Sequence, residues 1–252
     1  MIAILSPAKR MEVKGSKDNF TMPEFLPQAE ELMKKLKTLK SKQLQKLMDI
    51  STKLGDINVE RNFHFQYEHN SDNSTQAILS YKGDVYVGLE ADKFSDAELD
   101  FTQKHLRILS GLYGVLLPLD IIQEYRLEMG TKLKIGRKKD LYHFWNGKLT
   151  ESINEALISS GSELLVNLAS DEYYKALNEK KLKAEIIKIQ FREYKNEELK
   201  FISFNTKKAR GMMARYIVKN RITGKENLKG FDFENYYFDE KLSSENEYFF
   251  VR

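Results

Sequence analysis

The sequence predicts an α+β fold in which a mixed sheet and surrounding helices form a single compact body over residues 1–252. Short apolar runs and amphipathic helical patterns interleave irregularly, which favours this class over a regular Rossmann alternation. The chain has only four prolines, and no Gly/Ser linker, low-complexity segment or internal repeat divides it. Its 252 residues are enough to bury an adequate core as one body.

The first quarter of the chain predicts one strand followed by helices. An apolar run at residues 2–5 predicts a short buried strand, and this strand delivers residues 6–9 to its carboxyl end. Helical patterns follow at residues 24–36, 41–48 and 51–61. Ser41 and Ser51 are suited to cap the second and third of these helices.

The rest of the chain adds both strands and helices. Residues 77–79 and 84–87 predict two short strands joined by a turn at Lys82 and Gly83. Ser95 and Glu98 have the spacing of a capping box and predict the start of a long helix. Further elements are expected as a helix at 146–159, a strand at 164–168, a helix at 171–177, and a hairpin of 184–191 with 199–204.

The composition excludes several classes of protein. The chain has no cysteine, so disulfides, thiolate metal sites, cysteine-ligated iron–sulfur clusters and thiol peroxidase chemistry are excluded. Its four histidines lack the spacing of a metal site, and no phosphate-binding or dinucleotide-binding glycine motif occurs, so we expect no metal and no cofactor. The N-terminal apolar run is too short for a signal peptide, and no run is long enough to span a bilayer. We expect a cytoplasmic protein.

The charge is unevenly distributed along the chain. The net charge of +4 does not by itself indicate a nucleic-acid partner. Residues 175–225, however, contain 15 Lys or Arg against 5 Glu and no Asp, a balance of +10, whereas residues 226–252 have 7 acidic and 3 basic residues, a balance of −4. A basic block with an acidic border can form a positive surface. A solvated lysine-rich face has the same composition and remains the alternative.

A helix expected at residues 206–222 has one apolar and one cationic face. Ala209, Met213 and Tyr216 fall on one arc, and no acidic residue within the helix offsets the cations on the other. The cations of this face repel one another, and this unfavourable arrangement is easier to explain if the face binds phosphate. The candidate DNA-binding residues of this helix are Lys207, Lys208, Arg210, Arg215 and Lys219.

The apolar run at residues 105–130 carries isolated charges that need partners. Arg107, Arg126 and Glu128 accompany a run of Leu, Ile, Val and Tyr, so they must be paired or face a ligand. Arg126 and Glu128 suit either a structural ion pair or a polar site. Lys9 follows the first strand, where the carboxyl edge of a sheet often presents ligand-binding groups. We expect Lys9, Arg107 and Arg126 to lie deep in the same cationic cleft as the basic helix.

Residues 41–62 are a candidate helix-hairpin-helix element. Such an element binds a DNA phosphate through free backbone amides at the start of its second helix, and Lys46 and Lys53 would add charge. The glycines usual in this hairpin are missing from the turn at Ile50 and Ser51, and only Gly55 is nearby. By pattern alone, an ordinary pair of helices is the better interpretation.

Several long motifs identify a family. They are SPAK at 6–9, QAILSYKGDVYVGL at 76–89, the run 105–130, LYHFW at 141–145, NLASDEYYK at 167–175 and ISFNTKKARGMMARYIVKNR at 202–221. Together they closely resemble the bacterial peroxide stress protein YaaA family from Met1 to about Arg252. The resemblance implies an unusual single-body mixed fold, a role in surviving hydrogen peroxide by limiting intracellular iron, and DNA binding that includes a helix-hairpin-helix.

The leading hypothesis is a non-enzymatic DNA-binding protein, taken as a monomer, that contacts phosphates largely independently of sequence and favours distorted or partly unpaired DNA. The main alternative is an enzyme acting on a nucleotide or nucleic acid. In that case Glu128 would be the acid or base, Lys9 and Arg126 would orient phosphate, and Asp84 or Asp171 would recruit a divalent cation. A deep pocket uniting these residues favours the enzyme, and an open groove favours binding alone. A third alternative is an acidic protein partner.

Overall fold

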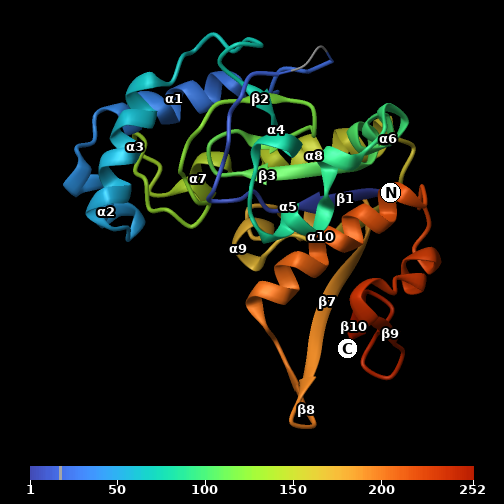
Figure 1. The fold of residues 1–252 in the computed structure, drawn as a ribbon. Coiled ribbons are helices and arrows are strands. Elements are labelled where there is room, and N and C mark those ends of the chain that lie inside the picture. Colours follow the sequence, from blue (N-terminus) through green and yellow to red (C-terminus); the bar gives the residue numbers. More distant parts are fainter. Residues whose placement is uncertain (17–18) are drawn as a thin grey trace.

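The computed structural model describes residues 1–16 and 19–252 and confirms a mixed α+β fold (Figure 1). The central sheet has the order β4-β3-β1-β6-β7-β10-β9, with β8 paired to β7, and a second sheet pairs β2 with β5. The strands are β1 (Ile2–Leu5), β2 (Thr75–Gln76), β3 (Leu106–Ser110), β4 (Gly114–Leu116), β5 (Ile121–Ile122), β6 (Leu164–Asn167), β7 (Glu185–Lys195), β8 (Glu198–Lys200), β9 (Tyr237–Asp239) and β10 (Glu247–Val251).

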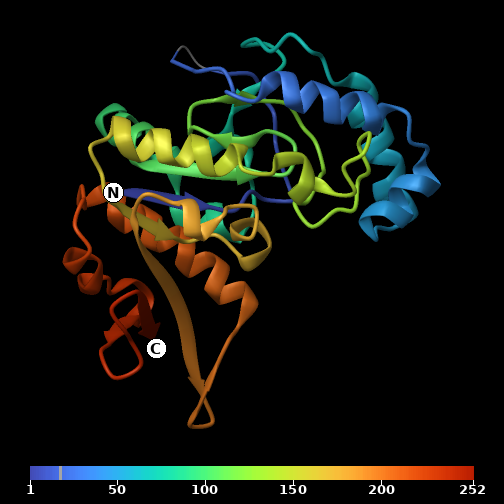
Figure 2. The ribbon, with the colours of Figure 1, turned by 180° about the vertical axis from the view of Figure 1, so that it is seen from behind.

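Helices cover both faces of the sheet. In Figure 1, α5 and α10 lie on the near face, and in Figure 2 α8 lies on the opposite face, while α1, α2 and α3 form a lobe at one side. The α-helices are α1 (Leu26–Lys37), α2 (Ser41–Met48), α3 (Thr52–His64), α4 (Ala77–Ser80), α5 (Asp84–Leu89), α6 (Asp96–His105), α7 (Leu141–Trp145), α8 (Lys148–Ser159), α9 (Asp171–Tyr174) and α10 (Ser203–Lys219). Short 3₁₀ turns are η1 (Ala91–Lys93), η2 (Glu179–Lys181), η3 (Glu226–Gly230) and η4 (Phe233–Asn235).

The parallel core of the sheet creates a switch point beside β1. Strands β3, β1, β6, β7 and β10 run parallel, and β1 is fully buried between β3 and β6. A strand buried on both faces is apolar throughout, which explains the sequence of β1. The chain passes from β1 to β3 on one side and returns to β6 on the other. Consequently the loops that follow β1 and β6 diverge and leave a crevice at the carboxyl edge of the sheet.

Helices α5 and α10 cross at two glycines. A Cβ atom added to Gly211 would lie 1.7 Å from the carbonyl oxygen of Val85, and one added to Gly88 would lie 2.1 Å from that of Lys208. Neither space admits a methyl group, because the obstructing atoms belong to the backbone. The two helix backbones therefore approach each other directly, and this contact fixes α10 against the sheet face.

Most predicted elements are confirmed. The strand at 2–5, the helix at 41–48 and the hairpin of β7 and β8 are present, and the helix predicted at 206–222 is α10, shifted toward the N-terminus. Glu98 accepts a hydrogen bond from the Ser95 backbone N–H at 2.8 Å, so the capping box of α6 is formed. Ser51 caps α3 as expected, whereas Ser41 is the first residue of α2 and follows the N-cap Lys40.

The strands predicted at 77–79 and 84–87 are wrong. Both segments are helical, as α4 and α5. Short apolar runs have no periodicity that separates a buried helix from a buried strand, so β-branched residues such as Val85 and Val87 pointed to strands. The second strand of the predicted hairpin is also shorter than expected, because β8 ends at Lys200 and α10 begins at Ser203.

Residues 41–62 form a packed pair of helices, and their geometry does not identify a helix-hairpin-helix element. The turn between α2 and α3 places Asp49 in a left-handed conformation at the C-cap of α2. Gly55 permits a close approach of α3 to α2, since an added Cβ would lie 2.8 Å from Ser41 Oγ and Gln45 Cγ. The glycine of this segment therefore serves helix packing.

We predict that Gly211→Ala reduces the free energy of unfolding by about 3 kcal/mol or more, because the added methyl group separates α5 from α10. Urea unfolding followed by circular dichroism measures this loss. Gly224→Ala is the control, since its Cβ would meet only Asn227 Oδ1 at 3.8 Å. Equal stability of the two variants would contradict the close crossing.

A second prediction concerns Asp120, whose carboxylate accepts hydrogen bonds from the Thr21 hydroxyl at 2.6 Å and the Leu117 N–H at 2.7 Å. Burial raises the pKa of Asp120 from 3.8 to about 6, although these hydrogen bonds and Arg107 oppose the rise. The folded state therefore binds the proton more tightly. The stabilising contribution of this group is complete below the unfolded pKa and is lost as the pH rises through the folded pKa.

Urea unfolding at several pH values tests whether the contribution of Asp120 to stability falls as the pH rises. Between about pH 4.5 and pH 7.5, wild type should lose roughly 2 kcal/mol of stability relative to Asp120→Asn, which has no titrating carboxyl group. A difference between the two proteins that stays constant with pH, or that grows in favour of wild type as the pH rises, would refute the assignment.

Candidate functional site

A pocket of about 590 Å³ lies at the switch point of the sheet. This position, outside the carboxyl ends of parallel strands whose connections diverge, is where open α/β sheets bind ligands. The pocket collects residues from distant parts of the sequence. Its walls are the loop 6–10 after β1, residues 83–85 at the start of α5, residues 125–128, residues 168 and 170–173 after β6, and Lys207 and Arg210 of α10.

Hydrogen bonds hold the two loops of the pocket together. The Ser170 N–H donates to Ser6 Oγ at 2.9 Å, and Ser6 Oγ donates to Ser170 Oγ at 3.3 Å. The Tyr86 hydroxyl donates to the Ser6 carbonyl oxygen at 3.1 Å. Gly83 lies so close to the loop after β1 that an added Cβ would be 2.8 Å from the Cβ of Ala8. The mouth of the pocket is therefore built on fixed elements.

The three candidates Lys9, Arg126 and Glu128 form one ionic network in this pocket. Lys9 Nζ lies 2.6 Å from Glu128 Oε2, and an Arg126 terminal nitrogen lies 3.1 Å from Glu128 Oε1. The Glu128 carboxylate thus bridges a 64% exposed lysine and an arginine that is 13% exposed. Their proximity agrees with the prediction of a shared cleft, while their functional roles stay predictions.

Two arginines in the pocket have unused donors. The Nε atoms of Arg126 and Arg210 are buried and lack a hydrogen-bond partner among residues 1–16 and 19–252. Burial lowers the pKa of Arg210; Asp171 opposes this effect and Arg192 adds to it. Lys207, one turn from Arg210, is exposed and forms no ion pair with any residue that the structure describes. Lys207 is therefore accessible to an anion, whereas the Nε atoms of the two arginines are enclosed by protein.

Carboxylates make the pocket mixed in charge. Asp84, Asp171 and Glu172 line it together with Glu128. Glu172 accepts a hydrogen bond from the Gly130 N–H at 2.8 Å, which fixes the segment after Glu128. In the described part of the chain, no group of three or more His, Asp or Glu side chains is arranged to hold a metal ion.

Buried tyrosines underlie the pocket. Ser110 Oγ accepts the N–H groups of Leu112 and Tyr113, so its own proton is directed to the Tyr125 hydroxyl at 2.6 Å. The Tyr125 hydroxyl also forms a hydrogen bond with that of Tyr81 at 2.8 Å. Burial raises the pKa of Tyr125 to about 12, so this lining residue is neutral at physiological pH. Tyr125 therefore adds a polar but uncharged group to the lining of the pocket.

The cationic face predicted for α10 is divided and largely neutralised. Lys207 and Arg210 enter the pocket, but Lys208 pairs with Glu234, Arg215 with Glu90, and Lys219 with Glu98 at 2.8 Å. These carboxylates come from other parts of the chain, so the helix sequence did not reveal them. The prediction that all five cations share one cleft is wrong for Lys208, Arg215 and Lys219.

Three further candidates lie outside the pocket. Arg107 donates to the backbone carbonyl oxygens of Gln103 and Leu106 at 3.0 and 2.7 Å, which is a structural role. Lys46 lines a separate groove, and Lys53 is exposed on α3. Sequence reasoning missed Arg10 and Glu172 as lining residues. The sheet-edge argument used for Lys9 applies equally to Arg10, and the motif at 167–175 contains Glu172.

The fold and the site define an α+β protein with a charge-lined pocket at the switch point of a mixed sheet. The family model described as peroxide stress protein YaaA matches residues 1–242. The chain therefore belongs to the peroxide stress protein YaaA family, as its motifs predict. Membership supports a role in the response to oxidative stress and hydrogen peroxide. No helix in the described residues is both long and apolar enough to cross a membrane.

Proposed function

We propose that the protein takes part in the peroxide response by binding DNA at the mouth of the switch-point pocket. The observation that carries this proposal is that Arg126, Arg210 and Lys207 line one pocket, where Lys207 is exposed and forms no ion pair with the described residues. Charge-assisted hydrogen bonds from arginine to phosphate are strong and directional. The contact uses the phosphate backbone, so it is largely independent of base sequence.

The mixed charge of the pocket restricts how DNA binds. Four carboxylates oppose the cations, so the interior does not attract a whole phosphate backbone. One phosphate at Arg126, Arg210 and Lys207, with an unpaired nucleotide over the tyrosine floor, satisfies both features. Partly unpaired DNA is therefore the preferred form. Bound protein shields the strand, and limiting intracellular iron protects the same DNA, because ferrous iron converts peroxide into radicals that cleave it.

Fluorescence anisotropy with duplex, bubble and single-stranded DNA across a salt series tests the proposal. The Lys9→Gln, Lys207→Gln double variant should bind DNA about tenfold or more weakly, and its log–log salt slope should be less steep by about 1, since the one phosphate contact contributes about 0.9. Both side chains are exposed, so this variant keeps its fold.

The matched control is the Lys208→Gln, Lys219→Gln variant, which has the same charge but loses cations that pair with Glu234 and Glu98. Its DNA affinity should change by less than about threefold, as expected for charges outside the contact. If the control loses as much affinity as the pocket variant, net charge alone governs binding and the pocket assignment fails.

An enzyme acting on a nucleotide or nucleic acid is the second candidate. It is favoured by the pocket that unites Lys9, Arg126 and Glu128 with Asp84 and Asp171. Glu128 would serve as the base, with Lys9 and Arg126 positioning phosphate. Lys9 and Arg126 lie within 3.1 Å of its carboxylate oxygens.

We predict that Glu128→Gln separates the two functions. Removing the carboxylate frees Lys9 and Arg126, so DNA affinity should rise by about threefold or more, whereas any conversion of bubble DNA seen with wild type on denaturing gels should be abolished. Conversion that continues at the wild-type rate would exclude Glu128 as the acid or base. Weaker DNA binding by Glu128→Gln would show that the ion pairs position Arg126.

A further inference from the structure

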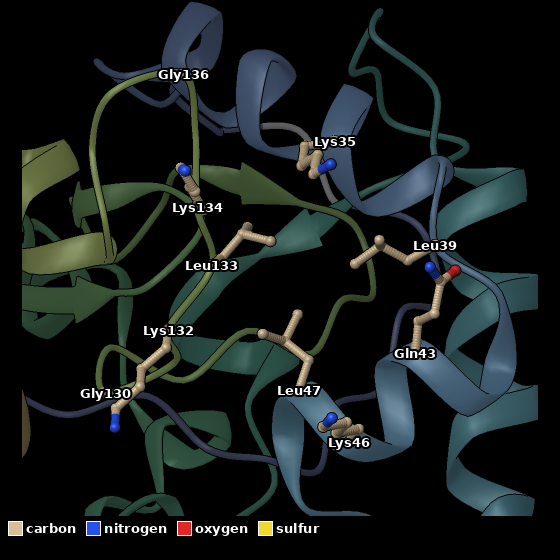
Figure 3. A pocket seen from close by; sticks show the side chains of 10 residues that line it. All are labelled: Lys35, Leu39, Gln43, Lys46, Leu47, Gly130, Lys132, Leu133, Lys134 and Gly136. Carbon is tan, nitrogen blue, oxygen red and sulfur yellow. The ribbon is translucent and has the colours of Figure 1, made fainter.

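A second hollow lies between the helical lobe and the segment 130–136. It is a groove of about 760 Å³, separate from the switch-point pocket. One wall is formed by the end of α1, the following turn and α2, and the other by the extended segment 130–136 (Figure 3). The groove residues are Lys35, Leu39, Gln43, Lys46, Leu47, Gly130, Lys132, Leu133, Lys134 and Gly136.

Four unpaired lysines surround the groove. They come from both walls, Lys35 and Lys46 from the helices and Lys132 and Lys134 from the segment, and all four are exposed. None forms an ion pair with the residues that the structure describes, and no acidic residue lines the groove. The lysines of α10 outside the pocket are, by contrast, held by carboxylates. The groove is therefore an uncompensated positive surface.

The centre of the groove is apolar. In Figure 3 the side chains of Leu39, Leu47 and Leu133 converge on the middle of the hollow, with the lysines around them. Leu39 and Leu47 are half-buried, and Leu133 is buried. An apolar centre with a charged rim is the anatomy of a protein–protein contact that receives an anchoring side chain.

We propose that this groove binds an acidic segment of a partner protein, with one apolar side chain on the leucines and flanking carboxylates on the lysines. Charge complementarity requires an anionic occupant. A small ligand fits less well, because small-molecule pockets enclose most of the ligand surface and this groove is open on one side. A phosphate backbone needs the lysines but has no use for the leucines.

A partner bound in the groove would also affect the switch-point pocket, because one segment of the chain lines both. The segment 126–136 carries Arg126 and Glu128 at one end and Lys132, Leu133 and Lys134 at the other. Between them, the Gly130 N–H is bound by Glu172 of the pocket. A partner seated on this segment thus contacts the same backbone that positions the ionic network of Glu128.

The test is fluorescence anisotropy of the full chain with a short, fluorescein-labelled, glutamate-rich peptide that has two leucines at its centre. A second peptide of equal charge has serines in place of the leucines. Wild type should bind the leucine peptide about tenfold more tightly than the serine peptide, and Lys46→Glu, Lys134→Glu should weaken binding about tenfold or more. Leu47→Gln should remove the preference for leucine while circular dichroism shows an intact fold.

The charge-matched control is Lys42→Glu, Lys53→Glu, which alters exposed lysines of α2 and α3 outside the groove. This variant should bind the leucine peptide like wild type. Equal binding of both peptides, or equal losses in the groove and control variants, would overturn the proposal. So would a groove variant that loses duplex DNA affinity without any peptide preference in wild type, or one that dissociates a dimer of this chain, because the occupant would then be DNA or a second copy.

Discussion

The close crossing of α5 and α10 is the contact on which the switch-point pocket depends. At Gly88 and Gly211 the backbones of the two helices meet without side chains between them. This approach places Lys207 and Arg210 of α10 beside the loop that precedes α5 and therefore beside the loop after β1. A larger residue at either glycine would separate the cations from the carboxyl edge of the sheet. The electrostatics of the site thus depend on a steric constraint.

Some cations of this protein form ion pairs with carboxylates from distant parts of the chain, and others do not. Along α10, three of the predicted binding residues have a glutamate partner from elsewhere in the fold. Exposed pairs of this kind contribute little stability, but they reduce the local positive potential. Among the described residues, Lys207 in the pocket and the four lysines around the groove form no ion pair. Charge density along a helix is therefore a weaker guide to a binding surface than the absence of a neighbouring carboxylate.

Segment 126–136 connects the two hollows that these cations line. Its first residues take part in the network of Lys9, Arg126 and Glu128, and its last residues form one wall of the groove. Glu172 holds the middle of the segment through the Gly130 N–H. The chain belongs to the peroxide stress protein YaaA family. A pocket at the switch point agrees with the proposal that the protein binds a ligand in the peroxide response. The partner proposed for the groove would contact this same segment.

The sequence by itself determined the fold class, the family, most helix bounds and the residues that follow the first strand. These features are local: an apolar run, a capping serine or an ordered motif is visible without knowing its neighbours. Tertiary structure decided that residues 77–79 and 84–87 are helical, that Lys9 meets Glu128, and that Lys208, Arg215 and Lys219 are neutralised. It also brought Lys35 and Lys46 opposite Lys132 and Lys134. Each of these outcomes depends on residues far apart in the chain, because burial and charge pairing are set by neighbours in space.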